Sequence, residues 1–281
     1  MEFHILITTN GFEGGWPSIE YGAWLAESLK AKATLLAVNE HPKPLQPDAG
    51  HPLEKFCDRA AQLLQARHVE HSLELRDGDA EQIIPMKAGE GEFITVIGPL
   101  GRSILRRWLM GRSIRHLMSE ISTPIVYVPQ ARIPLRKLLI CIGGLGYGMT
   151  AEHFALQIAA SAQAEVTLLH VVPPLELDYP TARIMRSEWQ HLVETNTPVG
   201  RSLRRAIETA QAAGLNARVV GRQGNVVEEI LAEAQEGQYD LLCMGSPYGT
   251  NTLRQLYAAN VTADIAQSIT CPLVTARYKK E

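Results

Sequence analysis

The stretch Val96-Ile97-Gly98-Pro99-Leu100-Gly101, followed after nine further residues by Gly111-Arg112-Ser113, decides the fold. An apolar run from Phe93 to Ile97 ends at a glycine, and a helical pattern begins soon after Gly101. Glycines between a buried strand and a helix let the backbone approach a bound group, and the N–H groups at a helix start favour an anion such as phosphate. The same glycines also suit a plain tight turn. The stretch by itself leaves both interpretations open.

The composition is that of an ordinary globular protein, and the length suits two domains. The chain has 281 residues, of which 46% are hydrophobic and 20% charged. A net charge of −3 provides no general attraction to nucleic acid or to a membrane surface. The four cysteines show no CxxC spacing, which fits a reducing compartment. We see neither a signal peptide nor a membrane-spanning apolar run, and we expect a cytoplasmic protein.

Two kinds of apolar segment alternate along the first half. Short runs rich in β-branched residues predict strands at 5–8, 33–38, 73–75, 93–97 and 125–128. Helical periodicity falls at 19–29, at 53–66, at 80–87 and in the arginine-rich segment after Gly101. Asp79 and Gln82 form a capping-box pattern before the third of these helices. The alternation indicates an α/β domain whose parallel sheet is covered by helices on both faces.

The second half repeats the same order. Leu168–Val171 echoes Leu35–Val38 at an offset of 133, whereas Arg222–Asn225 echoes Arg76–Asp79 at an offset of 146. Met244-Gly245 and Thr270–Val274 echo their counterparts at offsets of 147 and 148. The jump from 133 to 146 predicts an insertion of about 13 residues, which we place within 173–200. We therefore predict domain 1 at 1–131 and domain 2 at 136–281, joined by the polar link 130–137.

These landmarks resemble two universal stress protein domains in tandem. The resemblance rests on the ILxxT-type first strand, the LLxV second strand and the G-x2-G-x9-G spacing after the fourth, and it covers essentially the whole chain. It implies two doubly wound five-stranded parallel-sheet domains of the adenine-nucleotide alpha-hydrolase-like type. Ligands of such sheets bind beyond the carboxyl ends of the strands, at the topological switch point. Nucleotide-binding members of the family hold ATP there.

Carried over residue by residue, the resemblance places a nucleotide site in the first half. Its members are Asn10, Val38, Gly98, Gly101, Arg102, Gly111, Arg112 and Ser113. Asn10 stands where the family has Asp, so it keeps an acceptor oxygen and adds an amide donor. Arg112 stands where a small hydroxyl residue is expected, and its guanidinium either binds phosphate or blocks the pocket. Mg²⁺ is expected only together with ATP.

The corresponding site in the second half is degenerate. Its members are Gly143, Val171, Gly245, Gly249 and Asn260. Glycine occupies the Asp position, and the loop after Gly245 is one residue too long. The segment Gly143–Gly148 is not a dinucleotide fingerprint either, because Met149 stands where the last glycine would be.

Other side chains have plainer explanations beside their functional ones. The helix after Gly101 carries Arg102, Arg106, Arg107, Arg112 and Arg115, which suit either polyphosphate or a solvated face paired with carboxylates. A role with nucleic acid lacks interleaved aromatic residues and positive net charge. Cys141, Cys243 and Cys271 fall on expected strands, where buried thiols are ordinary core residues and a metal or redox cluster is the alternative.

The inserted segment is rich in apolar residues, including Leu175, Leu177, Tyr179, Ile184, Met185 and Trp189. It either forms a lid or contact surface over the crevice or extends the local core. The fifth strands, 125–128 and 273–276, are apolar edges that need cover. We predict that they pair within the chain as an internal pseudo-dimer. A homodimer of whole chains is a further guess.

Three functions remain. The first is a non-catalytic stress-response protein for binding and signalling, with ATP or another adenine nucleotide in domain 1. The second is a regulatory or interaction module that acts through its surfaces without nucleotide. A slow ATP hydrolase is weaker, because no base and no Mg²⁺-binding carboxylate is evident near the loop.

Overall fold

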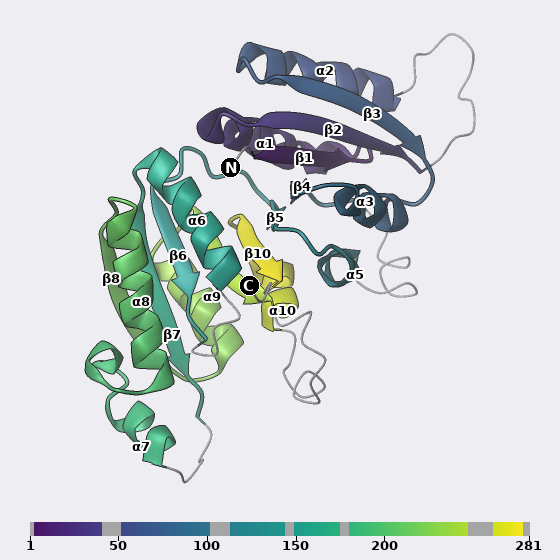
Figure 1. Cartoon of the computed structure of the whole chain (residues 1–281). Coiled ribbons are helices and arrows are strands. Elements are labelled where there is room, and N and C mark those ends of the chain that lie inside the picture. The colour runs from purple at the N-terminus through teal and green to yellow at the C-terminus, as the bar shows by residue number, and fades with distance from the viewer. Residues whose placement is uncertain are drawn as a thin grey trace. The chain divides into compact units, whose positions relative to one another are not determined.

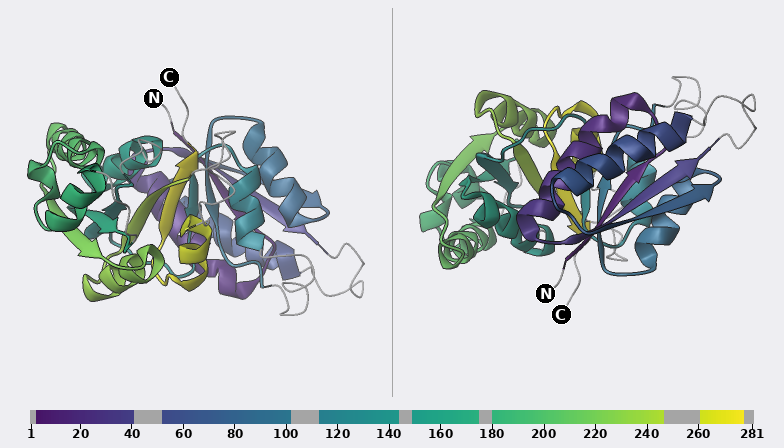
Figure 2. Two further views of the ribbon diagram at one scale, coloured as in Figure 1. Left: turned by 90° about the horizontal axis from the view of Figure 1, so that it is seen from below. Right: turned by 90° about the horizontal axis from the view of Figure 1, so that it is seen from above.

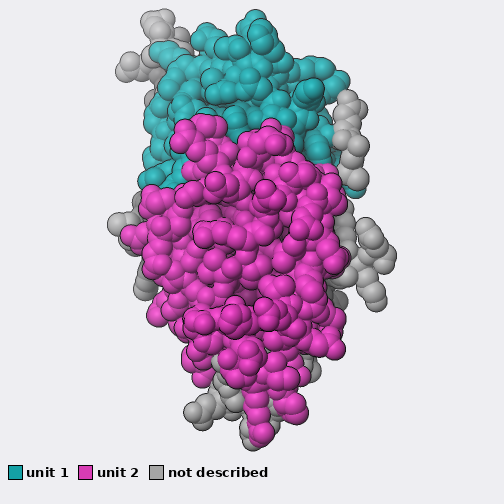
Figure 3. Space-filling model, turned by 90° about the vertical axis from the view of Figure 1, so that its left-hand side faces the viewer, with its two compact units in different colours: residues 1–133 teal, residues 134–281 magenta. Residues whose placement is uncertain are grey.

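The computed structural model describes residues 3–40, 52–101, 113–143, 149–174, 180–246 and 261–277. The chain divides into two compact units, Met1–Ile133 and Pro134–Glu281, which Figure 3 shows in different colours. This division falls inside the 130–137 link. Each unit is an α/β domain with helices on both faces of a parallel sheet (Figure 1; Figure 2).

Unit 1 follows the alternation of strands and helices seen in the sequence. Its described strands are β1 (His4–Thr9), β2 (Lys32–Asn39), β3 (His71–Asp77), β4 (Phe93–Ile97) and β5 (Ile125–Tyr127). Its described helices are η1 (Glu13–Gly15), α1 (Trp16–Leu29), α2 (Pro52–Ala66), α3 (Ala80–Gly89) and α5 (Ser113–Glu120). Asp79 caps α3 as predicted, because its carboxylate accepts from the Glu81 N–H.

The sheet of unit 1 is doubly wound. Its strand order is β3-β2-β1-β4-β5, and the paired strands are parallel. The chain builds outward from β1 to β3 and then returns to the other side of β1 with β4. The topological switch point therefore lies between the carboxyl ends of β1 and β4, where a sheet of this kind binds its ligands. The fold prediction is confirmed.

Burial explains which strands the sequence revealed. The side chains of Ile5, Leu6, Ile7, Val96 and Ile97 are fully buried between the two helix layers. Strand β4 has the predicted bounds, because a strand covered on both faces is a continuous apolar run. Strand β3 is longer than the expected 73–75, because it lies at the edge of the sheet and its outer residues are polar and partly exposed.

Unit 2 repeats this arrangement. Its described strands are β6 (Lys137–Cys141), β7 (Glu165–Val172), β8 (Ala217–Gln223), β9 (Leu241–Ser246) and β10 (Leu273–Arg277), in the order β10-β9-β6-β7-β8. Its described helices are α6 (Met149–Ala162), α7 (Pro180–Ser187), η2 (Leu192–Glu194), α8 (Pro198–Ala212), α9 (Val226–Glu236) and α10 (Val261–Ser268). Asn225 caps α9 through bonds from the Val227 and Glu228 N–H groups. The internal pairing of the two fifth strands stays a prediction.

The inserted segment contains α7, η2 and the start of α8. Leu192 is buried, so part of the segment extends the local core. The carbonyl oxygen of Trp189 lies where a side chain on Gly221 of β8 would begin, so the segment also covers the edge strand. Ile184 stays exposed. Leu175, Leu177 and Tyr179 lie outside the described residues.

Candidate functional site

The candidate site in unit 1 lies at the switch point, where sheets of this kind have their ligand-binding crevice. Three segments meet there: Asn10–Gly15 after β1, Glu40 after β2, and Gly98–Gly101 after β4. They come together because parallel strands place their carboxyl ends along one side of the sheet. The side chains of these segments decide what the crevice can hold.

Asn10 ties the three segments to one another. Its Nδ2 donates to Glu40 Oε2 and to the Leu100 carbonyl, each at 2.9 Å. Its Oδ1 accepts from the Phe12 N–H at 3.3 Å. Both amide hydrogens are therefore used within the chain. Turning the amide over would set its oxygen against two acceptors, so the amide has one favourable orientation.

Glu40 places a carboxylate at the start of α3. Its Oε1 accepts from the Ala80 N–H at 3.2 Å, while Oε2 accepts from Asn10. The first N–H groups of a helix are the part that attracts anions, because the helix dipole is positive there. The chain's own carboxylate thus occupies an anion-binding position beside the crevice. Sequence reasoning missed Glu40, although its place directly beyond β2 was the available signal.

Phe12 explains why residue 101 is glycine. A Cβ on Gly101 would overlap the Phe12 ring, and Gly101 has a left-handed φ of +63°. The ring therefore covers the glycine loop while remaining 42% exposed. Phe12 was not among the predicted residues, because an aromatic side chain beside glycines in a loop has no pattern that marks its contact.

Gly98 also has a packing explanation. A Cβ built on Gly98 would lie 2.5 Å from Ser18 Oγ of α1 and 3.2 Å from the Gly15 carbonyl oxygen. Ser18 Oγ is itself held by donating to that carbonyl at 2.7 Å. Helix α1 thus approaches the end of β4 so closely that only glycine fits between them. Neither Gly98 nor Gly101 needs a ligand to account for it.

A second set of contacts fastens the segment after β1 to α2. Arg59 of α2 bonds Glu13 at 2.8 Å, and its guanidinium lies 4.3 Å from the centre of the Trp16 ring. The Trp16 ring in turn meets Phe56 edge-on at 5.3 Å. These contacts hold η1 in place beside the crevice.

The remaining predicted residues of this site divide into two groups. Val38 is fully buried in β2. Arg102, Gly111 and Arg112 lie outside the described residues, and Ser113 is the first residue of α5. The structure therefore brings Asn10 to the glycine loop and leaves the predicted phosphate-binding part untested.

In unit 2 the described members of the predicted site look different. Val171 is buried, and Gly245 lies in β9, where its carbonyl accepts from Thr262 Oγ1 at 3.1 Å. A Cβ on Gly143 would meet no described atom within 4 Å. Gly249 and Asn260 lie outside the described residues.

Two ionisable side chains lie buried near this second switch point. His170 aligns with Ala37 of unit 1, and its Nδ1 donates to the Ile142 carbonyl at 2.6 Å, so the neutral ring carries its proton there. No described group partners its Nε2, and burial lowers the pKa of His170. Glu152 aligns with Ile19 of unit 1, and burial raises its pKa although Arg205 bonds it at 2.9 Å.

The cysteines fit the core interpretation. All four are free, and Cys243 and Cys271 are buried. Burial raises the pKa of the Cys141 and Cys243 thiols well above the usual range, and it raises that of Cys57 to about 11. Among the described residues, no group of three His, Cys, Asp or Glu side chains is placed to hold a metal ion.

The comparison with protein families settles the classification. A model described as the universal stress protein family matches residues 134–277, which is just over half of the chain. The chain belongs to the universal stress protein family. Universal stress protein YxiE of Bacillus subtilis (strain 168) is 27% identical over 146 residues, which cover 50% of this chain and 98% of that protein.

Solved structures extend the likeness in fold to both units of this universal stress protein. A universal stress protein from Archaeoglobus fulgidus DSM 4304 covers 99% of this chain and 97% of its own, with a TM-score of 0.67 and 16% identity. A functionally unknown protein from Pseudomonas aeruginosa PAO1 covers 97% of this chain and 92% of its own, with a TM-score of 0.66 and 15% identity. In the described part of the chain, no helix is long and apolar enough to span a membrane.

Proposed function

We propose that this universal stress protein is a non-catalytic stress-response module that acts through its surfaces, and that the crevice of its first unit is closed by its own side chains. The bonds from Asn10 to Glu40 and to the Leu100 carbonyl carry this proposal. They join the loops that would have to separate around a ligand. The proposal also treats unit 1 as a second domain of the family, in tandem with residues 134–277.

Charge supports the closed crevice. A nucleotide entering beside Asn10 would meet the Glu40 carboxylate, which already bonds the start of α3. Bringing phosphates toward this carboxylate is unfavourable, because like charges repel most strongly where water is excluded. The Asn10 amide could bond an adenine ring only after giving up an internal partner. Each such exchange lowers the net gain from binding.

A second candidate keeps the adenine nucleotide, with Mg²⁺ accompanying ATP. It is favoured by the contact of Asn10 with Leu100, because two elements of the predicted site meet there. On this view, Glu40 and Phe12 move aside when the nucleotide binds. The two candidates differ in the affinity of the unmodified protein.

Calorimetric titration of the full chain with ATP and Mg²⁺ tests the proposal. We expect wild-type binding weaker than about 1 mM, and no thermal stabilisation at millimolar ATP, where a tight ligand at 100 times its Kd would contribute about 2.7 kcal/mol. Glu40→Gln and Phe12→Ala should each increase the affinity for ATP. Glu70→Gln is the matched control, because it removes an exposed carboxylate at the amino end of β3.

The outcome separates the candidates. A wild-type Kd below about 100 µM, or nucleotide that co-purifies with the protein, would overturn the closed crevice. In that case Glu40→Gln should weaken binding if Glu40 contacts the nucleotide. If both variants bound ATP with the affinity of the wild type, neither Glu40 nor Phe12 would be what blocks nucleotide binding.

A further inference from the structure

Strand β3 is the outermost strand of the unit 1 sheet. It ends the strand order, and within the described residues its only partner in the sheet is β2 (Figure 1). An edge strand presents unpaired backbone N–H and C=O groups, which can pair with another chain. Natural edges are commonly protected by charged side chains, especially lysine, or by proline. The β3 sequence, HSLELRD, contains no lysine or proline, and its neighbouring charges Glu74 and Arg76 are of opposite sign.

One face of β3 presents two exposed leucines. Leu73 is 49% exposed and Leu75 is 56% exposed. Alternate residues of a strand share a face, so both leucines lie on the face opposite to Glu74 and Arg76. Large apolar side chains exposed in pairs on an edge mark a contact surface more often than single ones do.

Unit 2 covers part of the equivalent surface. Strand β8 aligns with β3 at an offset of 146, so Val219 and Gly221 correspond to Leu73 and Leu75. A side chain on Gly221 would overlap the carbonyl of Trp189, which belongs to the inserted segment. Unit 1 has no such insertion in its sequence. Leu73 and Leu75 of β3 are therefore exposed, whereas their counterparts Val219 and Gly221 in β8 are partly covered.

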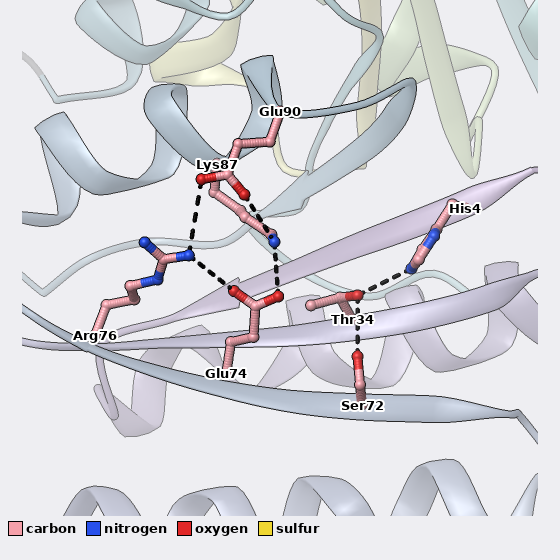
Figure 4. Close-up of polar contacts among 7 residues, drawn as sticks. All are labelled: His4, Thr34, Ser72, Glu74, Arg76, Lys87 and Glu90. Atoms are coloured by element: carbon pink, nitrogen blue, oxygen red, sulfur yellow. Dashed lines mark hydrogen bonds and ion pairs between the residues drawn. The ribbon is translucent and has the colours of Figure 1, made fainter.

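The opposite face of β3 carries a charged pair. Glu74 accepts from Lys87 Nζ at 2.6 Å and from Arg76 Nη2 at 3.3 Å, and the same Nη2 lies 3.7 Å from Glu90 (Figure 4). The bond from Lys87 lowers the pKa of Glu74, which keeps the carboxylate ionised. Within the described residues, Arg76 makes both of these contacts through Nη2, so its Nε and Nη1 donors can still bond a further acceptor.

Its repeat shows how much more an arginine at this position can bind. Arg222 of β8 aligns with Arg76 and bonds three carboxylates of its own unit, from Glu229, Glu233 and Glu236. Arg76 reaches two, at longer distances. The difference leaves Arg76 able to take another carboxylate.

We propose that two copies of this chain associate along the outer edges of their β3 strands. The two strands run antiparallel, and Leu75 of one copy lies opposite Leu75 of the other. In this register Glu74 of each copy faces Arg76 of the other, so the segment Glu74-Leu75-Arg76 is complementary to itself. Directly opposed side chains of antiparallel strands lie about 5 Å apart, close enough for these pairs to interact.

Charge selects this register over its neighbours. Centring the pair on Glu74 would set the two carboxylates against each other, which is unfavourable. Centring it on Leu73 would place Glu74 opposite Ser72 and Arg76 opposite Glu70, which lies before the strand and already pairs with Lys32. The surface is small, so the association is weak and depends on concentration. The inference does not depend on whether the crevice binds nucleotide.

Sedimentation velocity on the full chain, from about 5 to about 500 µM, tests the proposal over the range expected for a small interface. We expect the wild-type protein to shift from monomer to dimer with concentration. Leu75→Lys should weaken the dimer at least tenfold, because it puts two ammonium groups against each other. Met86→Lys is the matched control: Met86 lies on α3 and is 54% exposed, close to the value for Leu75.

A charge exchange tests the register. Glu74→Arg alone places arginines opposite one another, and Arg76→Glu alone places glutamates opposite one another, so each variant should stay monomeric. Mixing the two variants restores opposite charges on both pairs, and the mixture should associate. Circular dichroism melting of each variant checks that β3 remains folded.

Some outcomes would overturn the inference. A wild-type protein that stays monomeric at the highest concentration excludes the dimer. A dimer that persists in Leu75→Lys excludes this surface. Single charge variants that still associate, or a mixture that does not, exclude the proposed register.

Discussion

Replacing Gly98 by alanine distinguishes a packing glycine from a ligand-binding one. The new Cβ would lie 2.5 Å from Ser18 Oγ and 2.9 Å from Ser18 Cβ. Ser18 is buried, and its hydroxyl is held by the Gly15 carbonyl, so it cannot turn away without losing that bond. We expect α1 to shift away from the end of β4 in the variant.

The cost follows from two terms. Overpacking a well-packed interior by one methyl group costs roughly 1–3 kcal/mol. Loss or distortion of the Ser18 hydrogen bond adds up to about 1 kcal/mol. We expect Gly98→Ala to lower the free energy of unfolding of unit 1 by about 2 kcal/mol, which corresponds to a Tm lower by roughly 5–10 °C.

Urea unfolding followed by tryptophan fluorescence measures this change, because Trp16 and Trp24 lie in unit 1. Adding Ser18→Gly removes both close atoms, after which the nearest contact is the Gly15 oxygen at 3.2 Å. The double variant should therefore be more stable than the sum of the single effects predicts, by about 1 kcal/mol. Gly89→Ala is the control, because its Cβ would meet nothing within 4 Å.

One result would refute this reasoning. If Gly98→Ala unfolded within about 0.5 kcal/mol of wild type, the close approach of α1 would not require glycine. If the wild type bound ATP and Gly98→Ala did not, Gly98 would be needed for ligand binding. The proposal of a closed crevice would then be refuted.

Three further predictions concern unit 2. Burial raises the pKa of Glu152 above 4.5, so the wild-type protein loses stability as the pH rises through the folded-state pKa. Glu152→Gln removes this loss, and the Tm of the variant minus that of the wild type should increase between pH 4.5 and 7. A decrease in this Tm difference would mean that the attraction to Arg205 outweighs the effect of burial. Burial lowers the pKa of His170 below 6.5, so the wild type loses stability as the pH falls from 6.5 toward the folded-state value. His170→Asn keeps a donor near Nδ1 and should melt with less acid sensitivity there; equal sensitivity would contradict the assignment. Gly221→Ala should destabilise unit 2 by roughly 1–3 kcal/mol in thermal unfolding, because its Cβ would overlap the Trp189 carbonyl. An unchanged Tm would mean that the inserted segment moves aside without loss of stability.

The sequence predicted what depends on neighbouring residues. Strand β4 and the cap at Asp79 were found because a buried strand and a helix start each have a local pattern. Strand β3 was shortened in the prediction, because an edge strand carries polar residues on both sides of its leucines.

Contacts between distant segments could not be predicted in this way. Asn10 meets Glu40 across 30 positions and Leu100 across 90, and nothing in either stretch specifies that pairing. The resemblance directed attention to Asn10 as a ligand contact. The structure shows that its amide is already used within the chain. Which side chains fill a crevice depends on the three-dimensional packing that brings the loops together.

The Glu40 carboxylate has a consequence for regulation. Because it is tethered to the sheet, it competes with any incoming anion at an effective concentration of millimolar or more, whatever the protein concentration. A dissolved nucleotide would have to compete with this intramolecular carboxylate each time it binds. A cation that binds the Glu40 carboxylate would weaken this competition without changing the surrounding side chains. The fraction of chains that hold a nucleotide would then depend on the cation concentration of the surrounding solution.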